Sequence, residues 1–173
     1  MIPIRVAVNV SVRQINHLQF IHTVKQILEE TKLRPESLEI EITESIMQNI
    51  NESIEVLVQL RALGVKTAID DFWDRVFFIV LTKRLPFVTL KIDNSFIDNV
   101  SNQKIQPWLK AVIDIGLNLN MNIVAEGVET GEQCTILKAF HCSTGQGYLF
   151  SKPIPSDIVP VITKKLKDSR VFI

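Results

Sequence analysis

Several short apolar runs in this chain end in carboxylates, a pattern that suits metal-assisted chemistry. The runs are rich in Val, Ile and Leu and are typical of buried parallel β-strands, whose carboxyl ends meet at one edge of a sheet or barrel. Carboxylate and amide oxygens are the ligands that hard divalent cations prefer. The candidates at five successive strand ends are Asn9, Glu41, Glu44, Asp70, Asp71, Lys91, Asp93, Glu126 and Glu129.

The adjacent acids Asp70 and Asp71 constrain the geometry of such a site. Neighbouring side chains on a strand point to opposite faces, so both acids reach one site only where the strand ends and the backbone turns. The sequence Asp70-Asp71-Phe72 follows the apolar run Thr67-Ala68-Ile69 and fits such an end. We therefore expect both carboxylates at the same edge of the sheet.

Each candidate also has a simpler structural explanation. Lys91 alone suits one half of an ion pair with Glu126 or Asp93. Asp93 suits an N-cap for the segment that follows it, and Asn9 suits a cap or turn. Gln146, between two glycines, suits an ordinary turn amide. For any one residue taken alone, the simpler explanation is preferred over a functional role. Together these explanations require a coincidence at five successive strand ends, so we favour a shared site.

Helical periodicity separates the strand candidates and supplies the elements that position them. We expect helices at residues 16–31, 51–63, 76–84, 106–119, 132–140 and 156–167. In the first, an apolar stripe contains Leu18, Ile21, Val24, Ile27 and Leu28. Gly64 lies where the second helix needs a C-cap. The alternation predicts an α/β fold with about six parallel strands and right-handed crossovers, the last strand near residues 145–148.

Composition favours one domain spanning residues 1–173. The chain is 46% hydrophobic, with 19 Lys and Arg against 19 Asp and Glu, so no basic field indicates DNA binding. No apolar stretch is long enough to cross a bilayer and no signal peptide is evident, so we expect a cytoplasmic protein away from the membrane. Cys134 and Cys142 lack zinc-type spacing, and we interpret them as reduced, small hydrophobic residues.

Ordered motifs over nearly the whole chain resemble the EAL domain family. They are Glu41-Ile42-Thr43-Glu44-Ser45, Asp70-Asp71-Phe72, Lys83-Arg84-Leu85-Pro86, Lys91-Ile92-Asp93, Ala125-Glu126-Gly127-Val128-Glu129-Thr130 with Gln133, and Gln146-Gly147-Tyr148-Leu149 followed by Lys152-Pro153. The resemblance implies a cyclic di-GMP-specific phosphodiesterase, which hydrolyses cyclic di-GMP to linear pGpG, or a degenerate relative.

The resemblance also implies a role for each candidate. The metal ligands are Asn9, Glu41, Asp70 and Asp71, and Asp70 bridges two Mg²⁺ or Mn²⁺ ions. Two such ions generate a nucleophile at neutral pH and stabilise charge on the phosphate. Lys91 and Glu126 match the catalytic pair beside the attacking water. The supporting or substrate-binding residues are Glu44, Asp93, Glu129 and Gln146.

Two departures from the family pattern bear on activity and association. The resemblance begins at the third strand of the family's barrel, so we expect a partial TIM-type (β/α) barrel lacking the first two strands and the Glu-Ala-Leu motif with its metal ligand. Open edges at the strands containing Val8 and Gly147 favour a homodimer or a partner chain.

The second departure follows Asp71, where Trp73-Asp74-Arg75-Val76-Phe77-Phe78 replaces the family's Gly-Thr-Gly-Tyr-Ser-Ser loop. Glycines permit backbone angles that Trp and Arg resist. We expect weak or absent turnover. The alternative is a degenerate cyclic di-GMP-binding or protein-interaction module without turnover.

Overall fold

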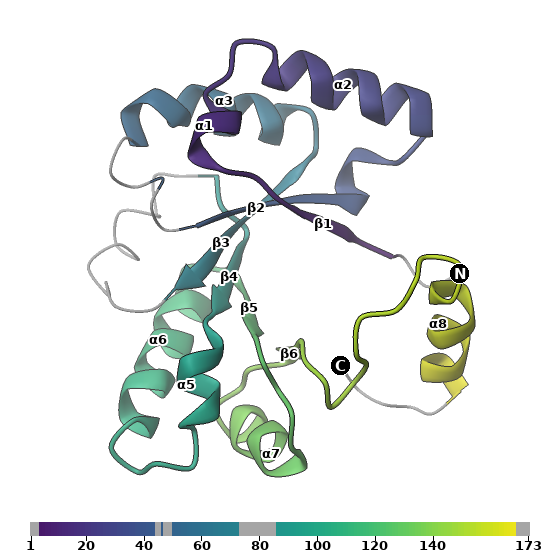
Figure 1. The fold of residues 1–173 in the computed structure, drawn as a ribbon. Helices are drawn as coiled ribbons and strands as arrows, with labels where there is room; N and C mark the ends of the chain where they lie inside the picture. Colours follow the sequence, from purple (N-terminus) through teal and green to yellow (C-terminus); the bar gives the residue numbers. More distant parts are fainter. Residues whose placement is uncertain (1–3, 44–45, 47–49, 73–85, 169–173) are drawn as a thin grey trace.

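The sheet contains six parallel strands in sequential order. The computed structural model describes residues 4–43, 46, 50–72 and 86–168. Every neighbouring pair of strands is parallel, and the curved sheet leaves a partial barrel (Figure 1). The strands are β1 (Val6–Asn9), β2 (Leu38–Thr43), β3 (Lys66–Phe72), β4 (Thr89–Ile92), β5 (Asn122–Ala125) and β6 (Thr144–Gly145). The predicted six-stranded partial (β/α) barrel is confirmed.

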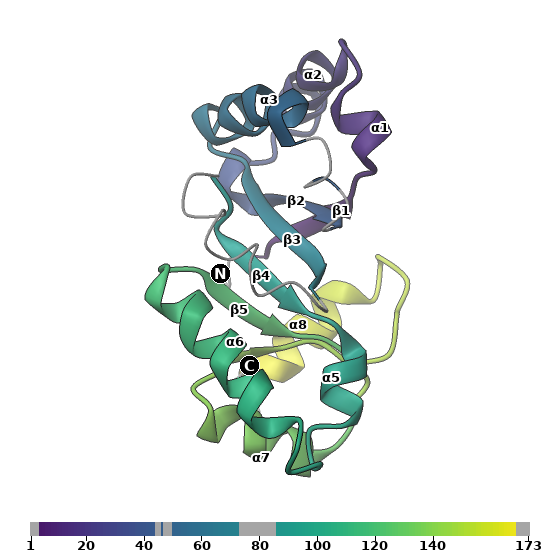
Figure 2. The same ribbon diagram turned by 90° about the vertical axis from the view of Figure 1, so that its left-hand side faces the viewer.

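The helices between the strands cover the outer side of the sheet (Figure 2), and the last helix, which follows β6, stands apart from it (Figure 1). They are α1 (Val12–Ile15), α2 (Phe20–Thr31), α3 (Ile50–Ala62), α5 (Asn94–Asp98), α6 (Gln106–Asn118), α7 (Gly131–Ala139) and α8 (Val159–Asp168), with a 3-10 turn at Pro35–Ser37. None of the described helices is long and apolar enough to cross a membrane. The helix predicted at 76–84 lies outside the described residues.

The helix predicted over residues 16–31 begins only at Phe20, where α2 starts, and the short helix α1 lies before this range, with a break between the two helices. Ser11 and Gln14 form a capping box that starts α1 early, and α1 ends at the C-cap Asn16. Leu18, expected on the apolar stripe, lies in the break and is 99% exposed. Our assignment of Leu18 was wrong because local capping ended the periodic pattern. Gly64 closes α3 as predicted, with φ +86° and an amide that donates to Arg61 O.

The two faces of the sheet differ in chemistry. The helix-facing side chains form the core, in which Ile42, Leu90 and Ile92 pack with Leu57 and Leu109 from the helices. Side chains alternate along a strand, so the residues between these aliphatic positions point to the concave side of the sheet. The acids and Lys91 are among them, so the partial barrel collects its polar groups on one side.

β1 forms one edge of the sheet and is more exposed than expected for a buried strand. All four of its residues are exposed, including Val6 and Val8. The other edge is β6, which has only two residues. The edge predicted at the strand containing Val8 is therefore present, and the opposite edge lies just before Gly147.

Candidate metal and phosphodiester site

Lys91 is the centre of a buried ion-pair cluster that joins three other strands. Its Nζ atom lies 2.8 Å from Glu41 Oε2, 2.8 Å from Asp70 Oδ1 and 2.7 Å from Glu126 Oε1. Glu41 belongs to β2, Asp70 to β3 and Lys91 to β4, while Glu126 directly follows β5. Parallel pairing places these strand ends at one level, so residues 35 positions apart become neighbours.

A backbone irregularity brings Asp71 to the same site. The pairing of β3 with β4 shifts register between Ile69 and Phe72, and Asp71 has φ +54° in the left-handed region. Carboxylate oxygens of Asp70, Asp71 and Glu126 consequently lie within 4.8 Å of one another. The predicted turn of the backbone at the end of this strand is confirmed, and Asp tolerates this conformation better than most residues.

Negative charge exceeds positive charge in this cluster. Burial raises the pKa of Glu126, and Lys91 opposes that rise. Burial also raises the pKa of Asp71, and the charges of Asp70 and Asp93 raise it further. Burial alone lowers the pKa of Lys91, but its hydrogen bonds to Asp70, Glu126 and Glu41 raise it above its ordinary value. Lys91 therefore stays protonated and offsets only part of the surrounding charge.

The donor set fits a hard divalent cation. The three clustered carboxylates of Asp70, Asp71 and Glu126 offer only oxygen ligands. Asp70 Oδ1 is buried and takes no hydrogen bond apart from its ion-pair contact with Lys91. A cation among these oxygens would reduce their mutual repulsion. Mg²⁺, Mn²⁺ and Ca²⁺ all have this ligand preference.

Asn9 and Gln146 lie at the same end of the sheet. Asn9 is the last residue of β1 and pairs with Glu41 in the register of the strands. The Gln146 amide donates to Ala125 O at 2.8 Å, beside Glu126, and its side chain is exposed. Both residues therefore flank the carboxylate cluster, although the structure gives neither of them a contact with Lys91.

The remaining predicted residues have mainly local partners. Asp93 caps α5 by accepting from the Ser95 amide at 2.9 Å, so its simpler explanation is confirmed, although its charge also reaches Asp71. Glu129 is exposed, and its backbone amide donates to Gln133 Oε1 at 2.8 Å. Glu44 lies outside the described residues.

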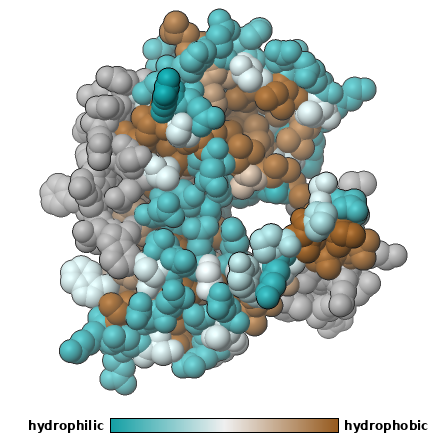
Figure 3. Space-filling model, in the orientation of Figure 1, coloured by the Kyte–Doolittle hydropathy of each residue, from teal (hydrophilic) through white to brown (hydrophobic). Residues whose placement is uncertain are grey.

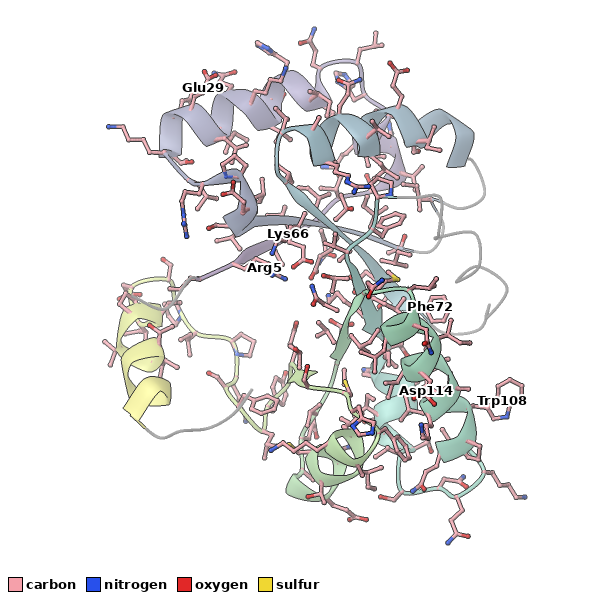
Figure 4. The ribbon with its side chains drawn as sticks, turned by 180° about the vertical axis from the view of Figure 1, so that it is seen from behind. Arg5, Glu29, Lys66, Phe72, Trp108 and Asp114 are labelled. Carbon is pink, nitrogen blue, oxygen red and sulfur yellow. The ribbon has the colours of Figure 1, made fainter. Side chains whose placement is uncertain are left out.

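The sequence analysis did not single out Glu39, a further buried carboxylate on the concave side. Glu39 Oε2 accepts from Arg5 Nη1 at 2.8 Å, and Glu39 Oε1 accepts a short hydrogen bond from the Thr89 hydroxyl. Glu39 precedes Glu41 by two residues and shares its face. The alternation in Leu38-Glu39-Ile40-Glu41 was the available signal. Arg5 and Lys66 lie together at the start of their strands, and Phe72 marks the far end of β3 (Figure 4).

Comparison with known sequences agrees with the geometry. The EAL domain profile matches residues 1–153. Cyclic di-GMP phosphodiesterase NbdA from Pseudomonas aeruginosa is 39% identical over 154 residues, which are 88% of this chain and 20% of NbdA. Signaling protein YkoW from Bacillus subtilis is 39% identical over 154 residues, 88% of this chain and 19% of YkoW. The chain thus spans about a fifth of the length of these relatives.

Comparison with solved structures gives the same family. The EAL domain of Mycobacterium smegmatis DcpA has a TM-score of 0.85 at 37% identity, covering 92% of this chain and 73% of that one. PaMucR phosphodiesterase in its c-di-GMP complex has a TM-score of 0.82 at 35% identity, and the match covers 90% of this chain and 64% of PaMucR. The manganese/cy-diGMP complex of Klebsiella pneumoniae BlrP1 has a TM-score of 0.79 at 29% identity, and the match covers 86% of this chain and 39% of BlrP1. With its sequence profile, its fold and its carboxylate-bearing strand ends in agreement, the chain belongs to the EAL domain family.

Proposed function

We propose that this site binds divalent metal and cyclic di-GMP and slowly hydrolyses the nucleotide to linear pGpG. The observation that carries the proposal is the cluster in which Lys91 contacts Glu41, Asp70 and Glu126, with Asp71 beside them. The names of the relatives NbdA and PaMucR supply the substrate class.

The metal ligands in this proposal are Asp70 and Asp71, joined by Asn9 and Glu41 from the neighbouring strand ends. Mg²⁺ or Mn²⁺ bound there would supply Lewis-acid activation of the phosphodiester and of the attacking water. Asp70 would be the ligand shared by two ions in this proposal, because its carboxylate lies near those of Asp71 and Glu126 and it shares Lys91 with Glu41.

Lys91 and Glu126 act on the reacting groups. The Lys91 ammonium orients a phosphate oxygen or the attacking water, and Glu126 accepts a proton from that water. Water attacks phosphorus, the bond from phosphorus to the ribose 3′ oxygen breaks, and the leaving oxygen takes a proton from solvent. The raised pKa of Glu126 makes it a stronger base than an exposed glutamate.

Supporting residues hold the site and the nucleotide in this proposal. Gln146, whose amide bonds to Ala125 O at the end of β5, and the exposed Glu129 would contact the nucleotide, and Asp93 fixes the start of α5 near Asp71. Glu44 follows β2 and would support the ligands from there. We expect slow turnover because the glycine-free sequence at residues 73–78 comes only one residue after Asp71, and disturbed outer contacts of metal ligands typically cost about 10–100-fold.

A hydrolysis assay with parallel calorimetry tests the proposal. Purified chain is incubated with cyclic di-GMP and Mg²⁺ or Mn²⁺, and pGpG is measured by chromatography. We expect metal-dependent product from the unmodified chain and from Asp114→Asn, whose exposed acid lies on α6 far from the cluster, and none from Asp70→Asn. Calcium-dependent binding without hydrolysis would favour the binding module. The absence of both binding and hydrolysis would overturn the proposal.

A further inference from the structure

Gln133 is a polar side chain that turns inward from a helix whose other polar residues face solvent. α7 lies in the part of the molecule where the space-filling view is mainly hydrophilic (Figure 3), and Glu132, Thr135 and Lys138 of this helix are exposed. Gln133 is only 9% exposed. Buried polar groups need hydrogen-bond partners, since each one left unpaired costs stability. The partners of Gln133 therefore indicate what this side chain does.

The side-chain oxygen of Gln133 holds two consecutive backbone amides. Gln133 Oε1 accepts from the Glu129 amide at 2.8 Å and from the Thr130 amide at 2.9 Å. The bond from Thr130 belongs to a capping box, in which the Gln133 amide donates to Thr130 Oγ1 at 3.2 Å. The bond from Glu129 lies outside that motif. Gln133 thus extends the cap of α7 backward into the segment that follows β5.

The side-chain nitrogen of Gln133 reaches a different helix. Gln133 Nε2 donates to Ile97 O at 3.2 Å, across 36 positions of the chain. Ile97 belongs to α5, the helix that follows β4 and has Asp93 as its N-cap. A helix cap does not require this contact. One amide group therefore joins the segment after β5 to the helix after β4.

The same segment also packs closely against the start of α5. Gly127 has φ +71°, and a Cβ atom at this position would lie 2.6 Å from the Cβ atom of Asn94, the first residue of α5. Only glycine allows a backbone to approach this closely. The amide of Glu126, which precedes Gly127, donates to Ile92 O at 3.1 Å. The position of α5 therefore bears directly on the backbone that carries Glu126.

We propose that Gln133 is a positioning residue for Glu126. Its amide group fixes the segment after β5 against α5, and this placement holds Glu126 Oε1 2.7 Å from Lys91 Nζ. Gln133 acts through the backbone and not on the reacting groups. Its effect on hydrolysis rests on the proposed function, whereas its effect on the backbone around Glu126 does not.

Two substitutions of similar size separate this role from helix capping. Gln133→Met removes every polar atom of the side chain, whereas Thr130→Val removes only the hydroxyl of the capping box. In the first variant, hydrogen exchange at the amides of Glu126, Val128 and Glu129 should become at least about tenfold faster than in the unmodified chain. In the second, it should stay within about threefold. A helix cap alone predicts similar effects of both variants, confined to α7.

Gln133→Glu tests the contact with α5 by itself. An ionised carboxylate still accepts from the two backbone amides but has no hydrogen to donate to Ile97 O. Exchange at Glu129 should therefore remain slow, while exchange at Glu126 should be faster than in the unmodified chain. This variant also provides the test if Gln133→Met does not fold. Slow exchange at both amides in Gln133→Glu would overturn the proposal.

Turnover of cyclic di-GMP with Mn²⁺ gives the functional measurement. The kcat should fall at least about tenfold in Gln133→Met, stay within about threefold in Thr130→Val and lie between these values in Gln133→Glu. If the unmodified chain has no turnover, the proposed function fails and the exchange rates alone decide the positioning role. Unchanged exchange at Glu126 in folded Gln133→Met, or equal losses of kcat in the Met and Val variants, would overturn the proposal.

Discussion

At the scale of single residues, the site depends on one lysine that is shared by three carboxylates. The side chain of Lys91 is 5% exposed, and those of Glu41 and Asp70 are each 10% exposed. Breaking a buried pair leaves an uncompensated charge, which costs more than the pair contributes. Lys91 therefore stabilises the metal-free fold as well as serving the proposed chemistry.

Replacing Lys91 by Met should expose this double role. Lys91→Met should lower the free energy of unfolding by about 3 kcal/mol, because the acids lose their shared cation. Manganese should then raise the melting temperature more for Lys91→Met than for the unmodified chain, since binding to the folded state stabilises it. Thermal melts with and without MnCl₂ measure both effects. Lys110→Met, at an exposed pair with Asp114, is the control and should change little.

The two cysteines should differ in reactivity. Burial raises the pKa of Cys142, whose thiol donates to Thr144 O at 3.4 Å, while Cys134 is partly exposed. The thiolate is the reactive form, so Cys142 should react only at a higher pH than an ordinary thiol, and slowly in the folded chain. Timed maleimide labelling with mass spectrometry should show one fast site, which Cys134→Ser removes. Equal rates in the folded chain would contradict the burial of Cys142.

At the scale of elements, the end of β3 decides whether two adjacent acids serve one site. Asp71 adopts φ +54° and the register with β4 shifts around it, so the strand departs from its alternation. A regular strand would turn the Asp71 carboxylate toward the helices. The irregularity instead places it with Asp70 and Glu126. The local backbone is thus part of the site.

Substitutions at Asp71 test this conformation separately from its charge. Asp71→Asn and Asp71→Val both remove the negative charge, but only Asn tolerates the left-handed region well. We expect Asp71→Val to be less stable than Asp71→Asn by about 1–2 kcal/mol. Urea denaturation of the two variants gives the difference. Equal stabilities would mean that Asp71 does not occupy this conformation in solution.

At the scale of the whole molecule, Glu39 joins strands that are distant in sequence. Its carboxylate accepts hydrogen bonds from Arg5, which precedes β1 and is 34 positions away, and from Thr89 of β4, which is 50 positions away. The contact lies on the same concave side as the Lys91 cluster, nearer the amino ends of the strands. It therefore helps to fix the curvature that aligns the strand ends.

Removing the Thr89 hydroxyl should weaken the fold without changing its shape. Thr89→Val leaves a buried carboxylate oxygen of Glu39 without its donor, which typically costs about 1–3 kcal/mol. Thr89→Ser keeps the hydroxyl and should lose less. Chemical denaturation measures both variants against the unmodified chain. A Thr89→Val variant as stable as the unmodified chain would show that this hydrogen bond contributes little.

The sequence by itself determined the number of strands, the parallel α/β class and the gathering of Glu41, Asp70, Lys91 and Glu126, because hydrophobic periodicity and strand-end position are local properties. It failed where competing local signals met, as at Leu18. Only the tertiary structure decided that Lys91 has three carboxylate partners, that Glu39 is buried on the same side of the sheet and that all four residues of β1 are exposed. These features depend on the register and curvature of neighbouring strands, and residues far apart in the chain fix them together.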